Sequence, residues 1–262
     1  MQGVILKESE LLDIALNNKK VKKADIPNIL VVLSKHYFSL GLSKEEVYDK
    51  LNEYYKSTDI GYNETVSYEF ITSLINRIYS SGRFDIVDVN KVVISVNEWN
   101  RIISLNDRGA EKLAFSMLVH QKVNEIKNPK SNGWINTERS YLLMDAGFTK
   151  QTLEVKLHFH TLYKKGYIGK RNAVDATGYL INYRDINVES DTKITITNFE
   201  KIITYYDEHR NGNKYKECER CGKRFKLSKN DYSSKYCALC KKDIQKIRQR
   251  ESMKKNRKKS KM

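Results

Sequence analysis

The sequence predicts a mainly α-helical chain with small β elements, an α+β fold, that ends in a compact cysteine unit and a basic tail. Three observations indicate this. Apolar residues recur at helical spacing up to about residue 213, with only short alternating runs between them. All four cysteines lie beyond that point, and so does nearly all of the excess of Lys and Arg over Asp and Glu.

The charge distribution separates the two parts of the chain. The 262 residues carry a formal net charge of +16. Residues 1–213 hold 29 basic against 27 acidic side chains, whereas residues 214–262 hold 19 against 5. A basic end on a near-neutral body indicates a polyanionic partner, with a purely solubilising tail as the alternative.

The composition speaks against a membrane or secreted protein. The longest uninterrupted aliphatic run, residues 29–33, is far shorter than the ~20 residues that a membrane span needs. The first residues show no basic stretch followed by an apolar one, so we expect no secretory signal. The sequence therefore predicts a cytoplasmic protein without membrane contact.

The first 95 residues predict a helical N-terminal region. Residues 25–39 form an apolar helix with Pro27 near its start, and Ser43 with Glu46 makes a capping box that opens a helix over 44–55. A third helix is expected over 64–80. Residues 91–96 alternate in the manner of a strand.

Residues 96–190 predict a second region with a definite order of elements. Trp99 begins a helical stretch and 109–126 form a long helix. A short helix over 137–146 then turns at Gly147, and Thr149 is placed to cap a helix over 150–165. Strands are expected at 166–170 and 179–183, with a polar loop between them. This order resembles the winged helix-turn-helix family over about residues 106–185.

The resemblance implies a way of contacting DNA. In that family the second helix of the turn enters the major groove and the hairpin, or wing, touches the backbone. Winged helices also serve as protein-docking modules. Carried over by position, the residues facing the groove are Lys150, Gln151, Glu154, His158 and Thr161, and the wing residues are Lys170 and Arg171.

Residues 191–213 are expected to connect this region to the cysteine unit. Residues 193–197 alternate as a strand, and Thr197 or Asn198 is placed to cap a helix that runs to about Tyr206. The polar stretch 209–217 reads as a linker. The predicted divisions are therefore 1–95, 96–190, 191–213, 214–240 and 241–262.

The four cysteines form the most specific pattern in the chain. Cys218 and Cys221 are separated by two residues, as are Cys237 and Cys240, with fifteen residues between the pairs. This spacing is typical of a four-cysteine structural zinc ribbon, because each pair supplies two adjacent corners of a tetrahedron. Gly222 suits the positive φ that closes such a turn. The alternatives are two disulfides or unrelated free thiols, of which disulfides are not expected in the cytoplasm. We therefore expect one structural zinc ion.

The tail after Cys240 has no glycine or proline, with a narrow apolar stripe only at Ile244 and Ile247. It is expected to be helical at its start and solvated further on, with phosphate backbone as its natural partner. The residues expected to contact nucleic acid there are Lys241, Lys242, Lys246, Arg248, Arg250, Lys254, Lys255, Arg257, Lys258 and Lys259.

Motifs of enzymes are not evident. The sequence has no phosphate-binding loop, dinucleotide glycine cluster or nucleophile elbow. The five histidines are scattered, and His158 and His160 point in different directions on a helix. Asp85 and Asp88, the only close acidic pair of interest, read as a solvated turn. An active site that is assembled from residues far apart in the chain remains an alternative. The sequence favours a protein without enzymatic activity and without a small-molecule substrate.

The whole arrangement resembles small DNA-binding proteins of bacteriophages and mobile elements from AT-rich bacterial hosts. The 35 lysines against 13 arginines fit AT-rich coding. The resemblance implies a setting in a bacterial host cell. Together the zinc ribbon, the basic tail and the winged helix predict a DNA-binding protein that acts there in transcription control or replication. Two alternatives remain. In the first, the chain is an adaptor that docks on a host polymerase, replisome or defence protein. In the second, the zinc ribbon and the tail bind RNA.

Overall fold

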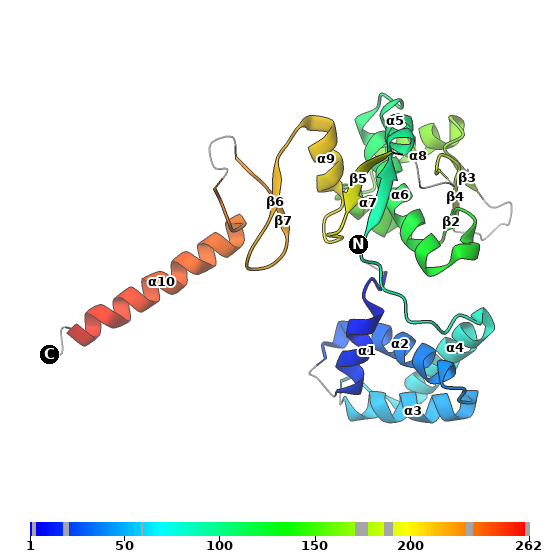
Figure 1. The fold of residues 1–262 in the computed structure, drawn as a ribbon. Coiled ribbons are helices and arrows are strands. Elements are labelled where there is room, and N and C mark those ends of the chain that lie inside the picture. The colour runs from blue at the N-terminus through cyan, green and yellow to red at the C-terminus, as the bar shows by residue number, and fades with distance from the viewer. Residues whose placement is uncertain are drawn as a thin grey trace. The chain divides into compact units, whose positions relative to one another are not determined.

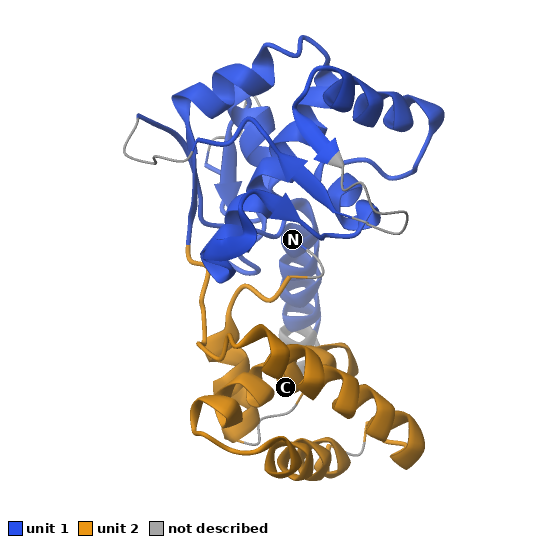
Figure 2. Cartoon of the chain, turned by 90° about the vertical axis from the view of Figure 1, so that its right-hand side faces the viewer, with its two compact units in different colours: residues 1–3, 91–262 blue, residues 4–90 orange. Residues whose placement is uncertain are grey.

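The computed structural model describes residues 1, 4–17, 21–58, 60–170, 178–185, 191–228 and 233–259, with the backbone alone at residues 170 and 254–259. The chain divides into two compact units (Figure 2). Unit 2 comprises residues 4–90, and unit 1 comprises residues 1–3 and 91–262. The division precedes the boundary expected at residue 95, because the strand that follows Lys91 pairs within unit 1.

Unit 2 consists of helices α1 (Glu8–Leu16), α2 (Ile26–Ser39), α3 (Lys44–Ser57) and α4 (Glu64–Ser81), with a short 3-10 turn at Lys23–Asp25 (Figure 1). Local signals set their ends. Pro27 lies in the first turn of α2, Ser43 and Glu46 form the expected capping box of α3, and the Asn63 side chain accepts from the Val66 N–H at the start of α4. Gly82, with a φ of 61°, ends α4. The core is aliphatic, with Ile29, Leu30, Leu33, Leu51 and Ile71 among its fully enclosed side chains.

Two carboxylates tie the segment after α4 to α1. Glu8 is 1% exposed, and its carboxylate accepts from Lys35 Nζ at 2.6 Å and from the Val87 N–H at 3.0 Å. Asp88 accepts from the Ser9 backbone N–H at 3.0 Å and from the Ser9 hydroxyl. Asp88 is therefore engaged at the start of α1, which corrects the expectation of a solvated turn.

Unit 1 contains three small antiparallel sheets, six α-helices and a short 3-10 turn at Pro129–Ser131 along its described residues. Strand β1 (Val92–Ser95) pairs with β5 (Thr192–Ile196), and β6 (Tyr215–Glu217) pairs with β7 (Arg224–Lys226). The third sheet has the order β2–β4–β3, from Trp134–Ile135, Tyr179–Ile181 and Ile168–Lys170. The helices are α5 (Val96–Ile103), α6 (Arg108–Lys127), α7 (Arg139–Asp145), α8 (Leu153–Lys164), α9 (Ile203–Asn211) and α10 (Ala238–Lys259).

Helix α6 is the centre of unit 1, because α5, α7, α8, α9 and strands of two sheets all pack against it (Figure 1). Its turns are buried almost all round from Ala110 to Val123, with Phe115 and Met117 fully enclosed. The Asp107 side chain caps its start by accepting from the Gly109 and Ala110 N–H groups.

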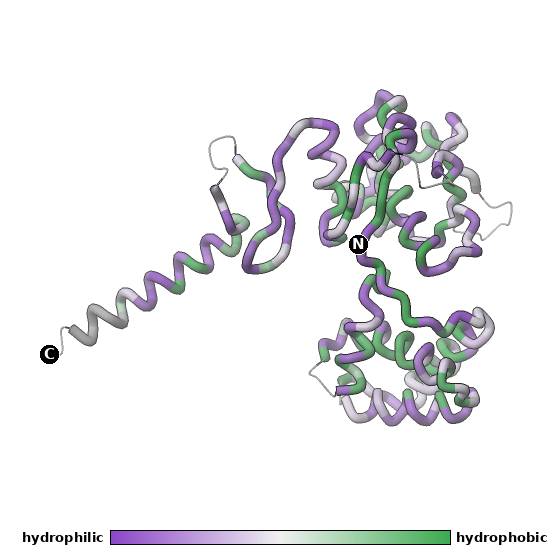
Figure 3. Tube along the Cα trace, in the orientation of Figure 1, coloured by the Kyte–Doolittle hydropathy of each residue, from purple (hydrophilic) through white to green (hydrophobic). Residues whose placement is uncertain are grey.

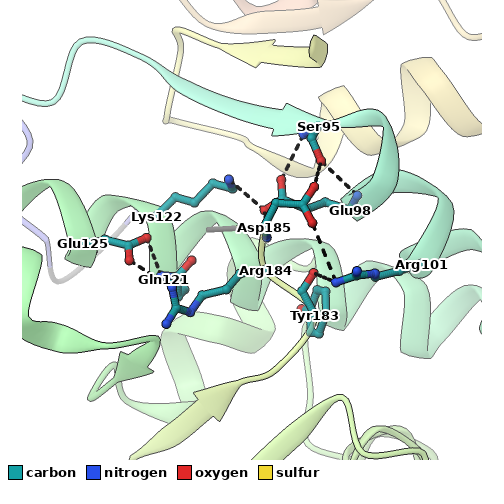
Figure 4. A network of polar contacts seen from close by, with 9 residues as sticks. All are labelled: Ser95, Glu98, Arg101, Gln121, Lys122, Glu125, Tyr183, Arg184 and Asp185. Atoms are coloured by element: carbon teal, nitrogen blue, oxygen red, sulfur yellow. Dashed lines mark hydrogen bonds and ion pairs between the residues drawn. The ribbon is translucent and has the colours of Figure 1, made fainter. Parts of the chain in front are cut away.

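A buried polar network joins α5, α6 and residues 183–185 (Figure 4). Glu98 is fully buried, and its carboxylate accepts from the N–H groups of Ser95 and Asp185 and lies 2.8 Å from Lys122 Nζ. Arg101 donates to the Tyr183 carbonyl at 3.1 Å. A buried carboxylate is tolerated only when charge and hydrogen bonds compensate it, and here both are present.

Two expected helices have different bounds in the structure. The helix expected over 150–165 begins at Leu153, and Thr152 rather than Thr149 is its cap, accepting from the Val155 N–H. The helix expected to run from a Thr197 or Asn198 cap to about Tyr206 instead begins at Ile203 without a side-chain cap and continues to Asn211, where Gly212 with a φ of 66° ends it. Residues 209–217 are therefore no linker, since they hold the last turn of α9 and strand β6.

The fold is mainly α-helical with small antiparallel sheets, as the sequence predicts. Among the described residues, no helix combines the length and the apolar character that crossing a lipid bilayer requires.

Candidate metal centre and nucleic-acid interface

The first pair of cysteines lies where the β6–β7 hairpin turns. Cys218 follows β6, and its backbone N–H donates to the Lys223 carbonyl at 3.0 Å. The Gly222 N–H donates to the Cys218 carbonyl at 2.8 Å, which closes the turn. Gly222 has a φ of 69°, a conformation that suits glycine and that the sequence predicts.

The second pair lies at the start of α10. Cys237 directly precedes the helix, Cys240 is in its first turn, and the Lys241 N–H donates to the Cys237 carbonyl at 2.9 Å. The Cys237 N–H donates to Cys218 Sγ at 3.3 Å, so the backbone of one turn contacts the sulfur of the other. The two turns thus face each other.

The four sulfur atoms meet the distance requirement of a metal site. Those of Cys218, Cys221, Cys237 and Cys240 all lie within 4.8 Å of one another. The Cys221 and Cys237 sulfurs are 3.8 Å apart. Two thiolates on adjacent corners of a tetrahedron, each ~2.3 Å from a metal ion, are ~3.8 Å apart, whereas a disulfide requires ~2.05 Å. The geometry therefore fits a four-thiolate metal centre and not a pair of disulfides.

The thiols influence one another strongly. Burial acts to raise the pKa of Cys218, but N–H donation from Cys237, Arg220 and Cys221 outweighs it and lowers this pKa to about 6. Burial, followed by the neighbouring thiols, raises the pKa of Cys240 to about 12. Four thiols this close cannot all lose their protons without a compensating positive charge nearby. A bound metal cation supplies that charge.

The hairpin that carries Cys218 and Cys221 is anchored on the body of unit 1. The Arg224 side chain, 8% exposed, donates to Glu208 on α9, and its guanidinium carbon lies 3.6 Å from the centre of the Tyr205 ring. On the other side, Asn198 Nδ2 donates to the Gly222 carbonyl at 2.7 Å. One half of the metal centre is therefore held by α9 and by the loop before it.

The basic side chains of α10 differ from those elsewhere in the chain in their ion pairing. Elsewhere, buried or half-buried cations pair internally: Lys35 with Glu8, Lys122 with Glu98, Arg184 with Glu125, Arg210 with Glu111 and Arg224 with Glu208. In α10, Lys242, Lys246, Arg248 and Arg250 are exposed and have no ion pair with any residue that the structure describes. Lys241 is exposed as well.

Lys242, Lys246 and Arg250 recur every four residues and so lie in one row along α10. Figure 3 shows α10 as largely hydrophilic along its described length. Of the remaining expected contacts, Lys254, Lys255, Arg257, Lys258 and Lys259 continue the helix, and their side chains lie outside the described ones.

The residues expected to read bases on α8 differ in how exposed they are. Lys150 and Gln151 are exposed just before the helix, Glu154 is exposed on it, and Thr161 is half-buried. The Gln151 amide, with its oxygen towards Arg139, accepts from that guanidinium at 3.1 and 3.2 Å. Lys170 ends β3, and Arg171 lies outside the described residues.

His158 is not available as a base contact, which corrects the sequence prediction. It is 7% exposed, its Nδ1 lies 3.3 Å from Asp107, and its ring stacks on Phe148. The cause is helical spacing, because His158 shares a face with the buried Val155, Phe159 and Leu162. It packs α8 against the start of α6.

Two further features concern the outer side of α8 and the contact of α7 with α6. Leu153 and Leu157, 73% and 56% exposed, lie one turn apart on the outer side of α8. His120 Nε2 lies 2.8 Å from Asp145, and Thr137 Oγ1 lies 3.2 Å from His120 Nδ1. His120 and Asp145 are buried, so we assign the pair to fixing α7 against α6. Their separation in the chain hid this contact from sequence reasoning.

Comparison with known proteins finds no matching family model, no similar curated protein and no similar solved structure. The function therefore has to be inferred from the chain's own geometry.

Proposed function

We propose that this chain is a zinc-containing DNA-binding protein of a phage or mobile element, without enzymatic activity, that acts in transcription control or replication. The observation that carries the proposal is the row of exposed cations on α10 that have no ion pair within the described part of the chain, next to the four-cysteine cluster. Cations without internal partners are free to replace the counterions of a phosphate backbone. Zinc is the ion that four tetrahedral thiolates most commonly hold in structural sites.

The order of elements in residues 108–181 supports a winged helix as the second contact. A long helix, a short strand, two helices and two further strands follow one another, and the sheet order is β2–β4–β3. In a winged helix, α8 enters the major groove. Lys150 and Gln151 then face the bases, and the exposed Leu153 and Leu157 are placed to contact thymine methyl groups.

The same two leucines favour one other function, an adaptor that docks on a host protein. Exposed leucines one turn apart on a helix are a common form of protein-docking surface. On this alternative, the tail only holds the complex near nucleic acid, and Leu153→Ala with Leu157→Ala abolishes capture of the host protein without changing DNA affinity.

Fluorescence anisotropy with a labelled duplex, compared with a single-stranded RNA of the same length, tests the proposal. We expect the full chain to bind the duplex more tightly at 50 mM salt, and the chain ending at residue 240 to lose most of this affinity. Tighter binding of RNA would support the RNA-binding alternative. No binding of either nucleic acid at 50 mM salt would overturn the proposal.

A further inference from the structure

We infer that the metal centre nucleates α10, so that the phosphate-contacting surface of the helix is assembled only when the metal is bound. This inference rests on the proposed function for its final step, because the surface is the one assigned to DNA. It goes further in making nucleic-acid affinity depend on metal occupancy.

The first argument is position. Cys237 directly precedes α10, and Cys240 lies three residues further on, within the first turn. The hydrogen bond from the Lys241 N–H to the Cys237 carbonyl closes that turn. A metal ion bound by both sulfurs therefore cross-links the two ends of the first helical turn, while Cys218 and Cys221 hold the ion on the anchored hairpin.

The second argument is that the described part of α10 packs little against the rest of the chain. Between residues 238 and 253, only Cys240 is buried and Ile244 half-buried, and every other residue is exposed. Lys242, Lys246 and Arg250 form like-charged pairs at a spacing of four residues, which destabilise a helix. The first turn has no acidic residue. Among the described residues, the helix therefore gains little from packing.

The third argument is the cost of starting a helix. Nucleation of the first turn is disfavoured by about a factor of 10³, whereas each further residue adds to an existing helix almost freely. Fixing the first turn through Cys237 and Cys240 removes this factor. Four thiolates around a divalent ion also leave the cluster anionic, and negative charge at the N-terminal end of a helix stabilises it.

The consequence concerns the row Lys242, Lys246 and Arg250. On a helix these three cations lie about 6 Å apart along one side, in reach of successive phosphates. On an unfolded chain the three side chains are not held in a row, and DNA binding must then offset the conformational entropy that is lost when they are ordered. Metal loss should therefore weaken DNA binding without removing a single basic residue.

The test uses the full chain, metal-loaded and after chelation under reducing conditions, with hydrogen exchange read by mass spectrometry. We expect chelation to accelerate exchange at residues 241–253 by about tenfold or more, while α6 keeps its protection. Cys240→Ser should have the same effect without a chelator. Unchanged protection of 241–253 after metal release would overturn the inference.

A matched pair of variants separates helix formation from metal binding. Gln249 is exposed in the middle of the described helix, so Gln249→Pro breaks α10 while leaving all four cysteines intact, and Gln249→Ala is its control. We expect Gln249→Pro to keep its metal and to lower duplex affinity, but by less than chelation does, because the turns before residue 249 keep their metal-bound start. Gln249→Ala should leave the affinity unchanged.

The outcomes distinguish this inference from the proposed function. Duplex affinity that stays the same in the chelated protein and in Gln249→Pro would overturn the link from helix to binding, although DNA binding itself would stand. Metal-loaded protein that shows the exchange effect but binds no duplex would overturn the proposed function and leave the nucleation of α10 intact.

Discussion

The salt dependence of duplex binding follows directly from the exposed row on α10. Replacing Lys242, Lys246 and Arg250 by Gln removes three cations that have no ion pair among the described residues. Gln keeps a helix-forming side chain of similar length, so the helix should remain. Each neutralised phosphate contributes ~0.9 to the slope of log affinity against log salt concentration. If each of the three cations neutralises one phosphate, their loss makes this slope shallower by ~2.7.

This change in slope is large enough to measure. Between 50 and 200 mM salt, the triple variant should lose ~40-fold less affinity than the wild type loses over the same range. Anisotropy titrations of one labelled duplex at four or five salt concentrations give both slopes. Circular dichroism of the variant checks that its helix content is unchanged.

A matched control removes the same charge elsewhere. Lys50, Lys56 and Arg77 are exposed on α3 and α4 of unit 2, and replacing all three by Gln lowers the net charge equally. We expect the slope of this variant to equal that of the wild type. Equal flattening in both triple variants would mean that overall charge, and not the α10 row, governs binding, which would refute the reasoning.

Three further predictions concern the stability of the two units. Glu98→Gln should lower the free energy of unfolding of unit 1 by about 3–5 kcal/mol, because it leaves Lys122 as a buried charge without its partner, and an unchanged urea midpoint would contradict this. The hydroxyl that donates to Asp88 holds the pKa of this carboxyl below its usual value. The wild type should therefore be more stable than Asp88→Asn at neutral pH and should lose this advantage as the pH falls below about 4. Thermal unfolding of both proteins over this pH range measures the difference, and a difference that does not change with pH would contradict the prediction. Gly109→Ala places a Cβ 1.9 Å from His158 Nε2 and should cost about 1–3 kcal/mol in chemical denaturation, a loss that ought to be smaller in a His158→Ala background.

Local signals in the sequence predicted the local parts of the structure. Each pair of cysteines belongs to one short turn, so the spacing within a pair brings its two sulfurs together, and only fifteen residues separate the two turns that meet. The capping box of Ser43 and Glu46 likewise lies within one helical turn. Such features require no knowledge of the rest of the fold.

Features that depend on distant contacts escaped prediction. Both Thr149 and Thr152 are acceptable caps, and the choice of Thr152 accompanies the packing of α8 on α6. That packing also buries His158 against Asp107 and leaves Leu157 exposed. The pairing of β1 with β5 joins segments about one hundred residues apart. A single sequence contains no signal for such a pairing.

The most direct test of the account is a footprint of duplex DNA on the full, metal-loaded chain, read from the acetylation of each lysine by mass spectrometry. With the protein saturated by duplex, the account predicts that Lys242 and Lys246 on α10 become strongly shielded while Lys50 and Lys56 on α3 react as they do without DNA. Unchanged reactivity of Lys242 and Lys246 in the saturated complex would contradict the claim that α10 carries the nucleic-acid interface.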